Sequence, residues 1–230
     1  MTAMTVEPLP RRSFAARAGA IRLRMDPKYV RGSVTTASAL DGLRYPLIRL
    51  GDVAESIQYG LSIRADSDAS GIAIVRMVNL HDDDWDLSDL KYVPAEAADL
   101  KRMQLRRGDV LFNRTNSEEL IGKCAVFDDP REFVFASYLI RVRLDTRRML
   151  PKFLALFLAT DIGRMQIDTV SRRIIGMANI SASELRDLLI PMPPVSEQLA
   201  MVTDANNARE ERSRLMLEAD ALVQALPPLR

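Results

Sequence analysis

The sequence predicts an α+β protein with a bent mixed or antiparallel sheet and packed helices, followed by one long C-terminal helix of the coiled-coil type. Three observations support this prediction. The chain has 230 residues, 47% hydrophobic and 27% charged, which is typical of a globular domain with an appendage. Short apolar segments with strand periodicity fill its middle. After a proline-rich boundary at 191–194, the chain contains neither glycine nor proline up to Leu226.

Residues 1–44 are predicted to form a basic N-terminal arm that is partly disordered. Residues 1–12 contain two prolines and no apolar periodicity, which favours disorder. The Ala- and Arg-rich segment 13–24 favours a short basic helix, and we expect Pro27 to end it. Such an arm either binds a phosphate backbone or is a solvated face that keeps the chain in solution.

Residues 45–194 are predicted to form the folded domain. Strand patterns occur at 73–78, 109–112, 123–127, 133–136 and 138–144. Pro151 suits the first turn of a helix and opens the apolar run 152–167, which we expect to be one helix packed on the sheet. Ser181 and Glu184 have the spacing of a capping box, and the strand at 188–190 must stop at the prolines.

Residues 195–230 are predicted to form one long helix up to about Leu226, with Ser196 as its N-cap. About 30 residues give roughly 45 Å, which is too long for so small a domain. One stripe repeats every three and four residues, as in a coiled-coil seam that contains a single arginine. Its members are Met201, Ala205, Ala208, Arg212, Leu215, Ala219, Leu222 and Leu226. The alternative is that the helix packs on its own domain.

The charges of the chain are segregated although the net charge is only +1. Residues 1–50 sum to +6, 51–100 to −8 and 101–150 to +4, so we expect opposed charged faces and only local attraction to a polyanion. Cys124 is the single cysteine, which excludes an intrachain disulfide. Apolar runs are far shorter than the roughly 20 residues that span a membrane, and the N-terminus lacks a signal-peptide core. A cytoplasmic protein without membrane contact is predicted.

Five segments together resemble a known family. They are LGDV at 50–53 followed by Gly60, RMVN at 76–79, LRRGDVLFNR at 105–114, IGK at 121–123 and IPMPPVSEQ at 190–198. In this order they resemble the target-recognition domain of the DNA-specificity subunits of type I restriction-modification enzymes, over about 45–226. Subunits of that family usually hold two recognition domains and two long helices, whereas this chain has one of each.

Most residues of these segments fit a structural role. Gly108 with Asp109 is expected to form a tight turn into a buried strand, and Gly122 a sharp return. Polar side chains in three loops are instead candidates for contacts with DNA phosphates or base edges. They are Arg114, Thr115, Asn116, Ser117 and Lys123 in the first loop, Gln58, Tyr59 and Arg64 in the second, and Arg172 and Arg173 in the third. The alternative for the first loop is an ordinary polar connection.

Catalytic patterns are weak. The segment 26–29, DPKY, faintly resembles the Asp/Asn-Pro-Pro-Tyr motif of DNA aminomethyltransferases, but it lacks the second proline and a glycine-rich cofactor loop. His81 is the only histidine, which argues against triads and multi-histidine zinc sites. The aspartates at 82–86 are interpreted as a solvated hairpin tip, and Cys124 as a core thiol. We therefore expect no catalytic residue, no metal and no cofactor.

The sequence and the resemblance together favour a non-catalytic, sequence-specific DNA-recognition subunit of a type I restriction-modification system. It would direct methyltransferase and restriction subunits to a bipartite site in double-stranded DNA. The expected partners are DNA, the methyltransferase subunits, a restriction/translocase subunit, and a second copy paired through the C-terminal helix. Two alternatives stay open: a solitary DNA-recognition module of another phage-defence or regulatory assembly, and a minimal nuclease.

Overall fold

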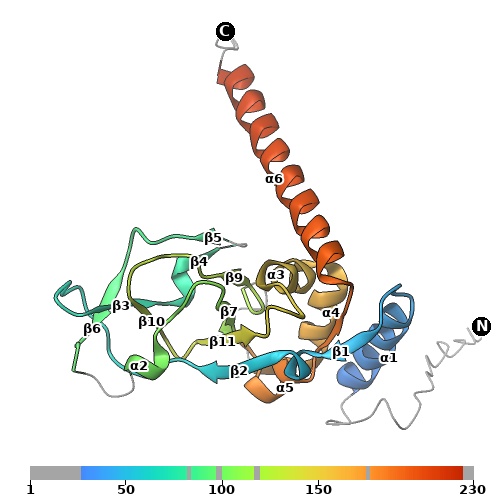
Figure 1. Ribbon diagram of the computed structural model, residues 1–230, viewed down its shortest axis with the longest axis horizontal. Coiled ribbons are helices and arrows are strands. Elements are labelled where there is room, and N and C mark those ends of the chain that lie inside the picture. Colours follow the sequence, from blue (N-terminus) through green and yellow to red (C-terminus); the bar gives the residue numbers. More distant parts are fainter. Residues whose placement is uncertain (1–26, 82–83, 97–99, 117–119, 175–176, 225–230) are drawn as a thin grey trace, which may run out of the picture.

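A four-stranded antiparallel sheet forms the centre of the domain. The computed structural model describes residues 27–81, 84–96, 100–116, 120–174 and 177–224 (Figure 1). The strands are ordered β2 (Ala54–Tyr59), β11 (Leu139–Leu144), β7 (Val110–Asn113) and β9 (Cys124–Val126). Neighbouring side chains of β11 enter two different cores, Leu139 one and Ile140 the other. Because both faces are covered, β7 is buried at every position, which explains its apolar sequence.

The smaller core lies beneath a second, mixed sheet. Strand β10 (Phe133–Phe135) pairs in parallel with β3 (Ile72–Val75), which pairs antiparallel with β6 (Lys91–Val93). Close by are the 3-10 turn η3 (Met77–Asn79), the hairpin β4 (Leu80–His81) and β5 (Asp84–Trp85), and the short helix α2 (Leu100–Met103). Within this core, the Phe127 ring makes edge-to-face contacts with two other rings. Its centre lies 6.1 Å from that of Trp85 and 5.5 Å from that of Phe133.

Helices cover the larger core. They are α3 (Pro151–Ala159), α4 (Asp161–Val170) and α5 (Ala182–Arg186). The 3-10 turn η2 (Leu50–Asp52) and the strand pair β1 (Leu47–Arg49) and β14 (Leu189–Pro191) also contribute to this core. The prediction of one helix over 152–167 is wrong, because Thr160 ends α3 and caps α4. The Gly163 amide donates to Thr160 Oγ1 at 3.2 Å.

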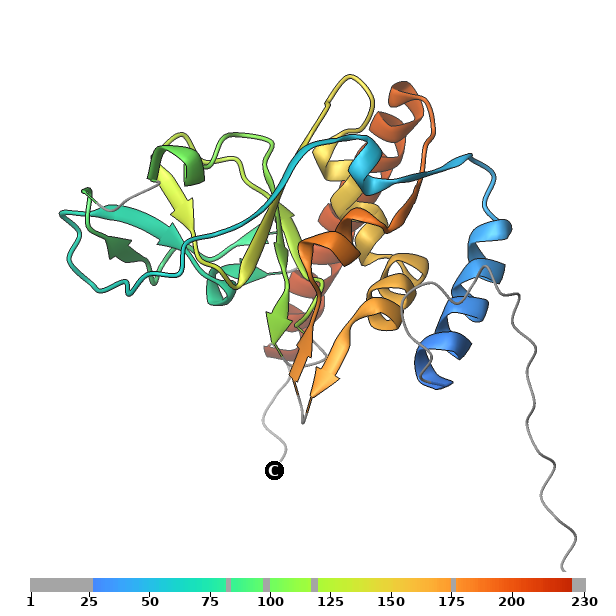
Figure 2. The same cartoon turned by 90° about the horizontal axis from the view of Figure 1, so that it is seen from below.

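A helix that the sequence analysis did not predict packs beside α4. Helix α1 (Pro27–Asp41) lies against it (Figure 2), with the Thr36 and Thr169 hydroxyls 3.2 Å apart. Pro27 is the first residue of α1, so it begins this helix. Proline has no N–H to lose at a helix start, so it fits this position. The predicted helix at 13–24 and the disorder predicted for 1–12 lie outside the described residues.

The long helix α6 (Val195–Gln224) leaves the domain after its first turns (Figure 1). Val202 is buried, whereas the side chains from 207 to 223 are all exposed. The alternative in which this helix packs on its own domain is therefore wrong for most of its length. Ser196 lies in the first turn and is not the N-cap, because the helix already begins at Val195. Leu226 lies outside the described residues.

Several local predictions are confirmed. Four of the five predicted strands correspond to β7, β9, β10 and β11. The strand predicted at 73–78 is shorter, because β3 ends at Val75 and residues 77–79 form η3, and the segment 188–190 corresponds to β14, which extends into Pro191. Gly108 and Gly122 have φ values of 88° and 81°, the left-handed conformation that their turns require. Ser181 and Glu184 form the capping box of α5. Within the described residues, no helix is both long enough and apolar enough to span a membrane.

Candidate nucleic-acid interface

The first and second candidate loops meet at an arginine–tyrosine stack. Arg114 follows β7, Tyr59 ends β2, and the guanidinium carbon lies 4.8 Å from the ring centre. Arg114 also donates through Nη1 to the Ser137 carbonyl at 3.2 Å and through Nη2 to Asn179 Oδ1 at 3.3 Å. The Tyr59 hydroxyl accepts from the Ala182 amide at 2.8 Å. Since Tyr59 is 39% exposed, the stack fixes a cation beside an accessible aromatic ring.

The third candidate loop reaches the same place through a small antiparallel sheet. Its strands are ordered β12 (Arg172–Ile174), β13 (Met177–Asn179) and β8 (Thr115–Asn116), and they lie beside one another in Figure 2. Asn179 of the middle strand stands opposite both Arg172 and Thr115. The Arg172 side chain is 67% exposed, and its Nε donates to Glu184 Oε1 at 3.2 Å. The structure thus brings together parts of all three loops.

Three of the predicted site residues do not join this group through their side chains, and for a fourth, Lys123, a backbone contact is described. Gln58 lies on the opposite face of β2, where its Oε1 accepts from Arg141 Nη2 at 2.6 Å. Arg64 is exposed, and within the described residues no recorded contact joins it to the stack. Thr115 is 7% exposed, so its side chain lies mostly inside the domain. Lys123 is partly buried, and its carbonyl accepts from the Asn113 amide at 2.8 Å.

For three other predicted residues, the structure describes the backbone alone or neither backbone nor side chain. Ser117 lies outside the described residues. The backbones of Asn116 and Arg173 are described, each paired with Ala178, but their side chains are not. Their strand pairing places the two backbones on either side of Ala178, the neighbour of Asn179 in the middle strand.

Two sets of polar residues are not among the predicted site residues. Asn179, which accepts from Arg114, lies in a segment where Ala178 and Ile180 are buried while Asn179 is exposed. That alternation is the strand pattern by which it could have been found. The second set is exposed and basic and consists of Lys101, Arg102, Arg106 and Arg107. Its signal is two basic pairs in one short segment, KRMQLRR at 101–107.

A buried charge cluster lies under this second set. Arg143 binds Asp109 in a bidentate arrangement, Nε to Oδ1 and Nη2 to Oδ2, both at 2.7 Å. This hydrogen bonding raises the pKa of Arg143. Arg141 is buried, whereas Arg143 is partly exposed, and burial, followed by repulsion from Arg143, lowers the pKa of the Arg141 guanidinium. Asp109 of the GDVLF segment thus anchors the fold, because it also accepts from the Arg106 amide at 2.9 Å.

The end of the matched motif IPMPPVSEQ joins α6 to the domain. The Gln198 side chain is fully buried, accepts from the Leu150 amide at 2.8 Å, and donates to the Arg148 and Pro193 carbonyls, both at 2.9 Å. Glu197 accepts a hydrogen bond from the Tyr45 hydroxyl, which raises the pKa of Tyr45. Gln198 and Glu197 therefore have structural roles at the junction of α6 and the domain.

Residues with catalytic potential are scattered. In the part of the chain that the structure describes, no group of three or more His, Cys, Asp or Glu side chains is placed to hold a metal ion. Cys124 is buried, with Sγ 3.8 Å from the Ala155 carbonyl oxygen. His81 and Asp86 are exposed at the β4–β5 hairpin, with Nε2 and Oδ2 4.0 Å apart. Asp82 and Asp83 lie outside the described residues.

Curated relatives of the chain are specificity subunits of restriction enzymes. The putative type I restriction enzyme MjaX specificity subunit of Methanocaldococcus jannaschii is 30% identical over 151 residues, which are 65% of this chain and 36% of that protein. The EcoKI specificity subunit of Escherichia coli strain K12 is 26% identical over 153 residues, 65% of this chain and 33% of that protein. The chain thus spans about a third of the length of these relatives.

Solved structures share the fold. The HsdS subunit of Thermoanaerobacter tengcongensis matches with a TM-score of 0.57 and 19% identity, over 77% of this chain and 45% of that one. A chain from a structural study of the assembly and conformational transition of the type I R-M system matches with a TM-score of 0.58 and 18% identity, over 86% and 48%. The model of the type I restriction modification DNA specificity domain matches residues 45–203, more than half of the chain. The chain belongs to this family of DNA specificity domains.

Proposed function

We propose that the chain is the sequence-specific DNA-recognition subunit of a type I restriction-modification system. It acts in the cytoplasm and directs methyltransferase and restriction/translocase subunits to a bipartite site in duplex DNA. In this proposal the chain has no catalytic role of its own. It supplies the DNA contacts, and its partner subunits supply the cofactor and the chemistry. Family membership supports the proposal, as does the concentration of the predicted polar loops at one place.

The meeting of three distant segments around Arg114 is the observation that carries the proposal. Arg114 follows β7, Tyr59 ends β2 and Arg172 begins β12. The fold holds them with the hydrogen bonds of the stack and of the three-stranded sheet. Arginine and amide side chains held in this way are suited to phosphates and base edges. A rigid support also lowers the entropic cost of binding.

Binding of duplex DNA to the full chain, alone and with its methyltransferase subunits, tests this site. We expect Arg114→Gln and Arg172→Gln each to weaken binding, because each removes a cation from the proposed interface. Arg214→Gln is the matched control, since Arg214 is an exposed arginine of α6 paired with Glu211. A loss of target-over-scrambled discrimination of about 1–3 kcal/mol identifies a base contact, and an equal loss on both duplexes identifies a phosphate contact. Wild-type affinity in both variants contradicts this site.

The exposed stripe of α6 supports a second part of the proposal, a homodimer. Leu215 and Leu222 of the stripe are 52% and 69% exposed. Two copies paired about a two-fold axis would bury them and place two identical recognition domains at opposite ends, reading inverted half-sites. We favour an antiparallel pair, because it sets Arg212 near Glu211 or Glu218 of the second copy, whereas a parallel pair sets Arg against Arg.

A further inference from the structure

Asn179 is an exposed asparagine whose side-chain amide is held by an arginine. It ends β13, the middle strand of the small sheet, and its chain neighbours Ala178 and Ile180 are buried. Arg114 Nη2 lies 3.3 Å from Oδ1 of this amide. Because a guanidinium donates hydrogen bonds and accepts none, the amide oxygen must face Arg114, and the amide nitrogen takes the other position. The orientation of the Asn179 amide is therefore fixed.

The arginine that holds Asn179 is itself fixed by other segments. Arg114 Nη1 donates to the Ser137 carbonyl at 3.2 Å, and the guanidinium carbon lies 4.8 Å from the centre of the Tyr59 ring. The Tyr59 hydroxyl in turn accepts from the Ala182 amide at 2.8 Å. The remaining guanidinium nitrogen, Nε, is buried. Arg114 is thus held inside the protein, and Asn179 is ordered before any ligand arrives, which lowers the entropic cost of binding.

The amide nitrogen of Asn179 is available to a ligand. Its two N–H groups have no hydrogen-bond acceptor among the described residues, whereas the amide oxygen is already engaged by Arg114. Of the residues opposite Asn179 in the sheet, Arg172 donates through Nε to Glu184 and Thr115 is mostly buried. At this place the surface therefore presents a donor of fixed direction.

A fixed donor distinguishes between the bases of a duplex. Asn179 lies on the antiparallel pair β12–β13, and the major groove is wide enough to admit two such strands. In that groove guanine and thymine present hydrogen-bond acceptors, cytosine presents a donor, and adenine presents one of each. Bidentate pairing with adenine needs the amide oxygen as well, which Arg114 engages. The polarity of the amide therefore favours guanine or thymine.

We propose that Asn179 determines specificity at one base pair of the target, by donating from its amide nitrogen to guanine or thymine in the major groove. Arg114 is the positioning residue, because its hydrogen bond to Oδ1 decides which end of the amide is presented. The inference rests on the proposed function, and it names the residue that reads one position of the DNA site. Positive charge attracts any duplex, whereas the donor of Asn179 distinguishes one base from another.

Selection of bound sequences from a randomised duplex library tests this assignment. The full chain, alone and with its methyltransferase subunits, is used as wild type, Asn179→Asp and Asn179→Ala. Aspartate keeps an oxygen for Arg114 but replaces the donor with an acceptor, so at one position the preference should change from guanine or thymine to cytosine or adenine. Alanine should abolish the preference at that position, a loss of roughly 5- to 150-fold in discrimination.

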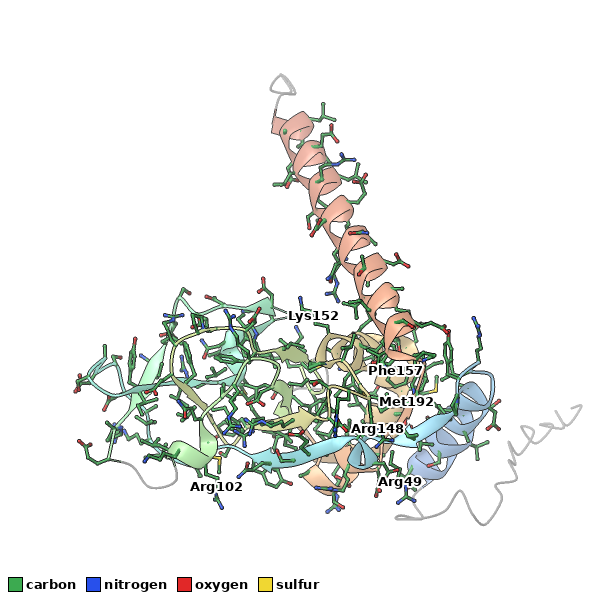
Figure 3. All side chains as sticks on the ribbon, viewed as in Figure 1. Arg49, Arg102, Arg148, Lys152, Phe157 and Met192 are labelled. Carbon is green, nitrogen blue, oxygen red and sulfur yellow. The ribbon has the colours of Figure 1, made fainter. Side chains whose placement is uncertain are left out.

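Two further variants separate positioning from charge. Arg114→Lys keeps the positive charge but loses the planar fork that holds the amide. We expect a weaker preference at the same position, with no further loss there when Arg114→Lys is combined with Asn179→Ala, because Arg114 acts on that base only through Asn179. Asn207→Asp is the matched control for the added negative charge. Asn207 is exposed on α6, whose outer side chains project from the domain in Figure 3, and this variant should select the wild-type motif.

The outcomes are distinct. A changed base at one position in Asn179→Asp, with lost preference at the same position in Asn179→Ala, supports the reading role. The wild-type motif in both Asn179 variants, or an equal loss at every position, overturns this inference and leaves the proposed function standing. An unchanged preference at that position in Arg114→Lys overturns the positioning role. A wild-type chain that selects no motif, alone and with its methyltransferase subunits, overturns the proposed function and this inference with it.

Discussion

Gln198 is the residue that ties the projecting helix to the domain. Its fully buried amide satisfies the Leu150 amide and the carbonyls of Arg148 and Pro193. The sequence indicates that Gln198 belongs to a characteristic segment, but not what it binds, because two of its partners lie about 50 positions earlier in the chain. Gly108 and Gly122 were predictable, since a turn with positive φ depends on the residue itself.

Replacing Gln198 is expected to destabilise the fold. Gln198→Leu removes the side-chain partner of three backbone groups, of which the Pro193 carbonyl is buried, and we expect the free energy of unfolding to fall by about 2–3 kcal/mol. Urea denaturation measures this loss. Ser196→Ala, an exposed change in the same turn, should alter stability by no more than about 0.5 kcal/mol. An equal effect of the two substitutions would contradict the anchoring role of Gln198.

Local sequence patterns are sufficient to predict some of the strands and helices but not others. Strands β7 and β11 carry strong apolar patterns and were found, whereas the short strands β8, β12 and β13 depend on pairing between segments far apart. Helix α1 was missed because Pro27 was interpreted as a stop, although proline also begins helices. The break between α3 and α4 has no proline, and it depends on the capping hydroxyl of Thr160.

Self-association through α6 is the prediction that belongs to this element. Light scattering should show a dimer for the wild-type chain and a monomer for Leu215→Asp with Leu222→Asp, because two charges then face the seam. Leu217→Asp with Ala221→Asp is the matched control, since both residues are exposed and lie off the stripe. A wild-type chain that stays monomeric at high concentration rules out the homodimer.

The effect of salt on affinity distinguishes self-association through α6 from DNA binding. Helix α6 carries six acidic and three basic residues, so the net charges of two copies repel each other, although Arg212 faces a glutamate of the second copy in the antiparallel pair. We therefore expect the dimer to tighten as salt rises, because screening weakens the repulsion. DNA binding should weaken over the same range. Analytical ultracentrifugation at low and high salt measures the first effect, and a dimer that dissociates as salt rises would contradict this view of the helix.

At the scale of the molecule, a two-sided sheet positions the proposed interface. The sheet β2–β11–β7–β9 separates two cores, and the end of β2 presents Tyr59 to one side and Gln58 to the other. The three loops were identifiable as polar segments of the sequence. Their meeting was not predictable, because it depends on strand order and on contacts such as Arg114 with Asn179, 65 residues apart.

Whether this chain selects the DNA sequence is tested by the methylation pattern of cells that encode it. Sequencing of methylated bases is compared between cells with the gene, without it, and with the gene restored. We expect one bipartite motif to lose its methylation on deletion and to regain it on restoration, with inverted-repeat halves if the chain acts as a homodimer. A motif without dyad symmetry would point to pairing with a different recognition subunit. A methylation pattern unchanged by the deletion would contradict the claim that this chain selects the DNA sequence.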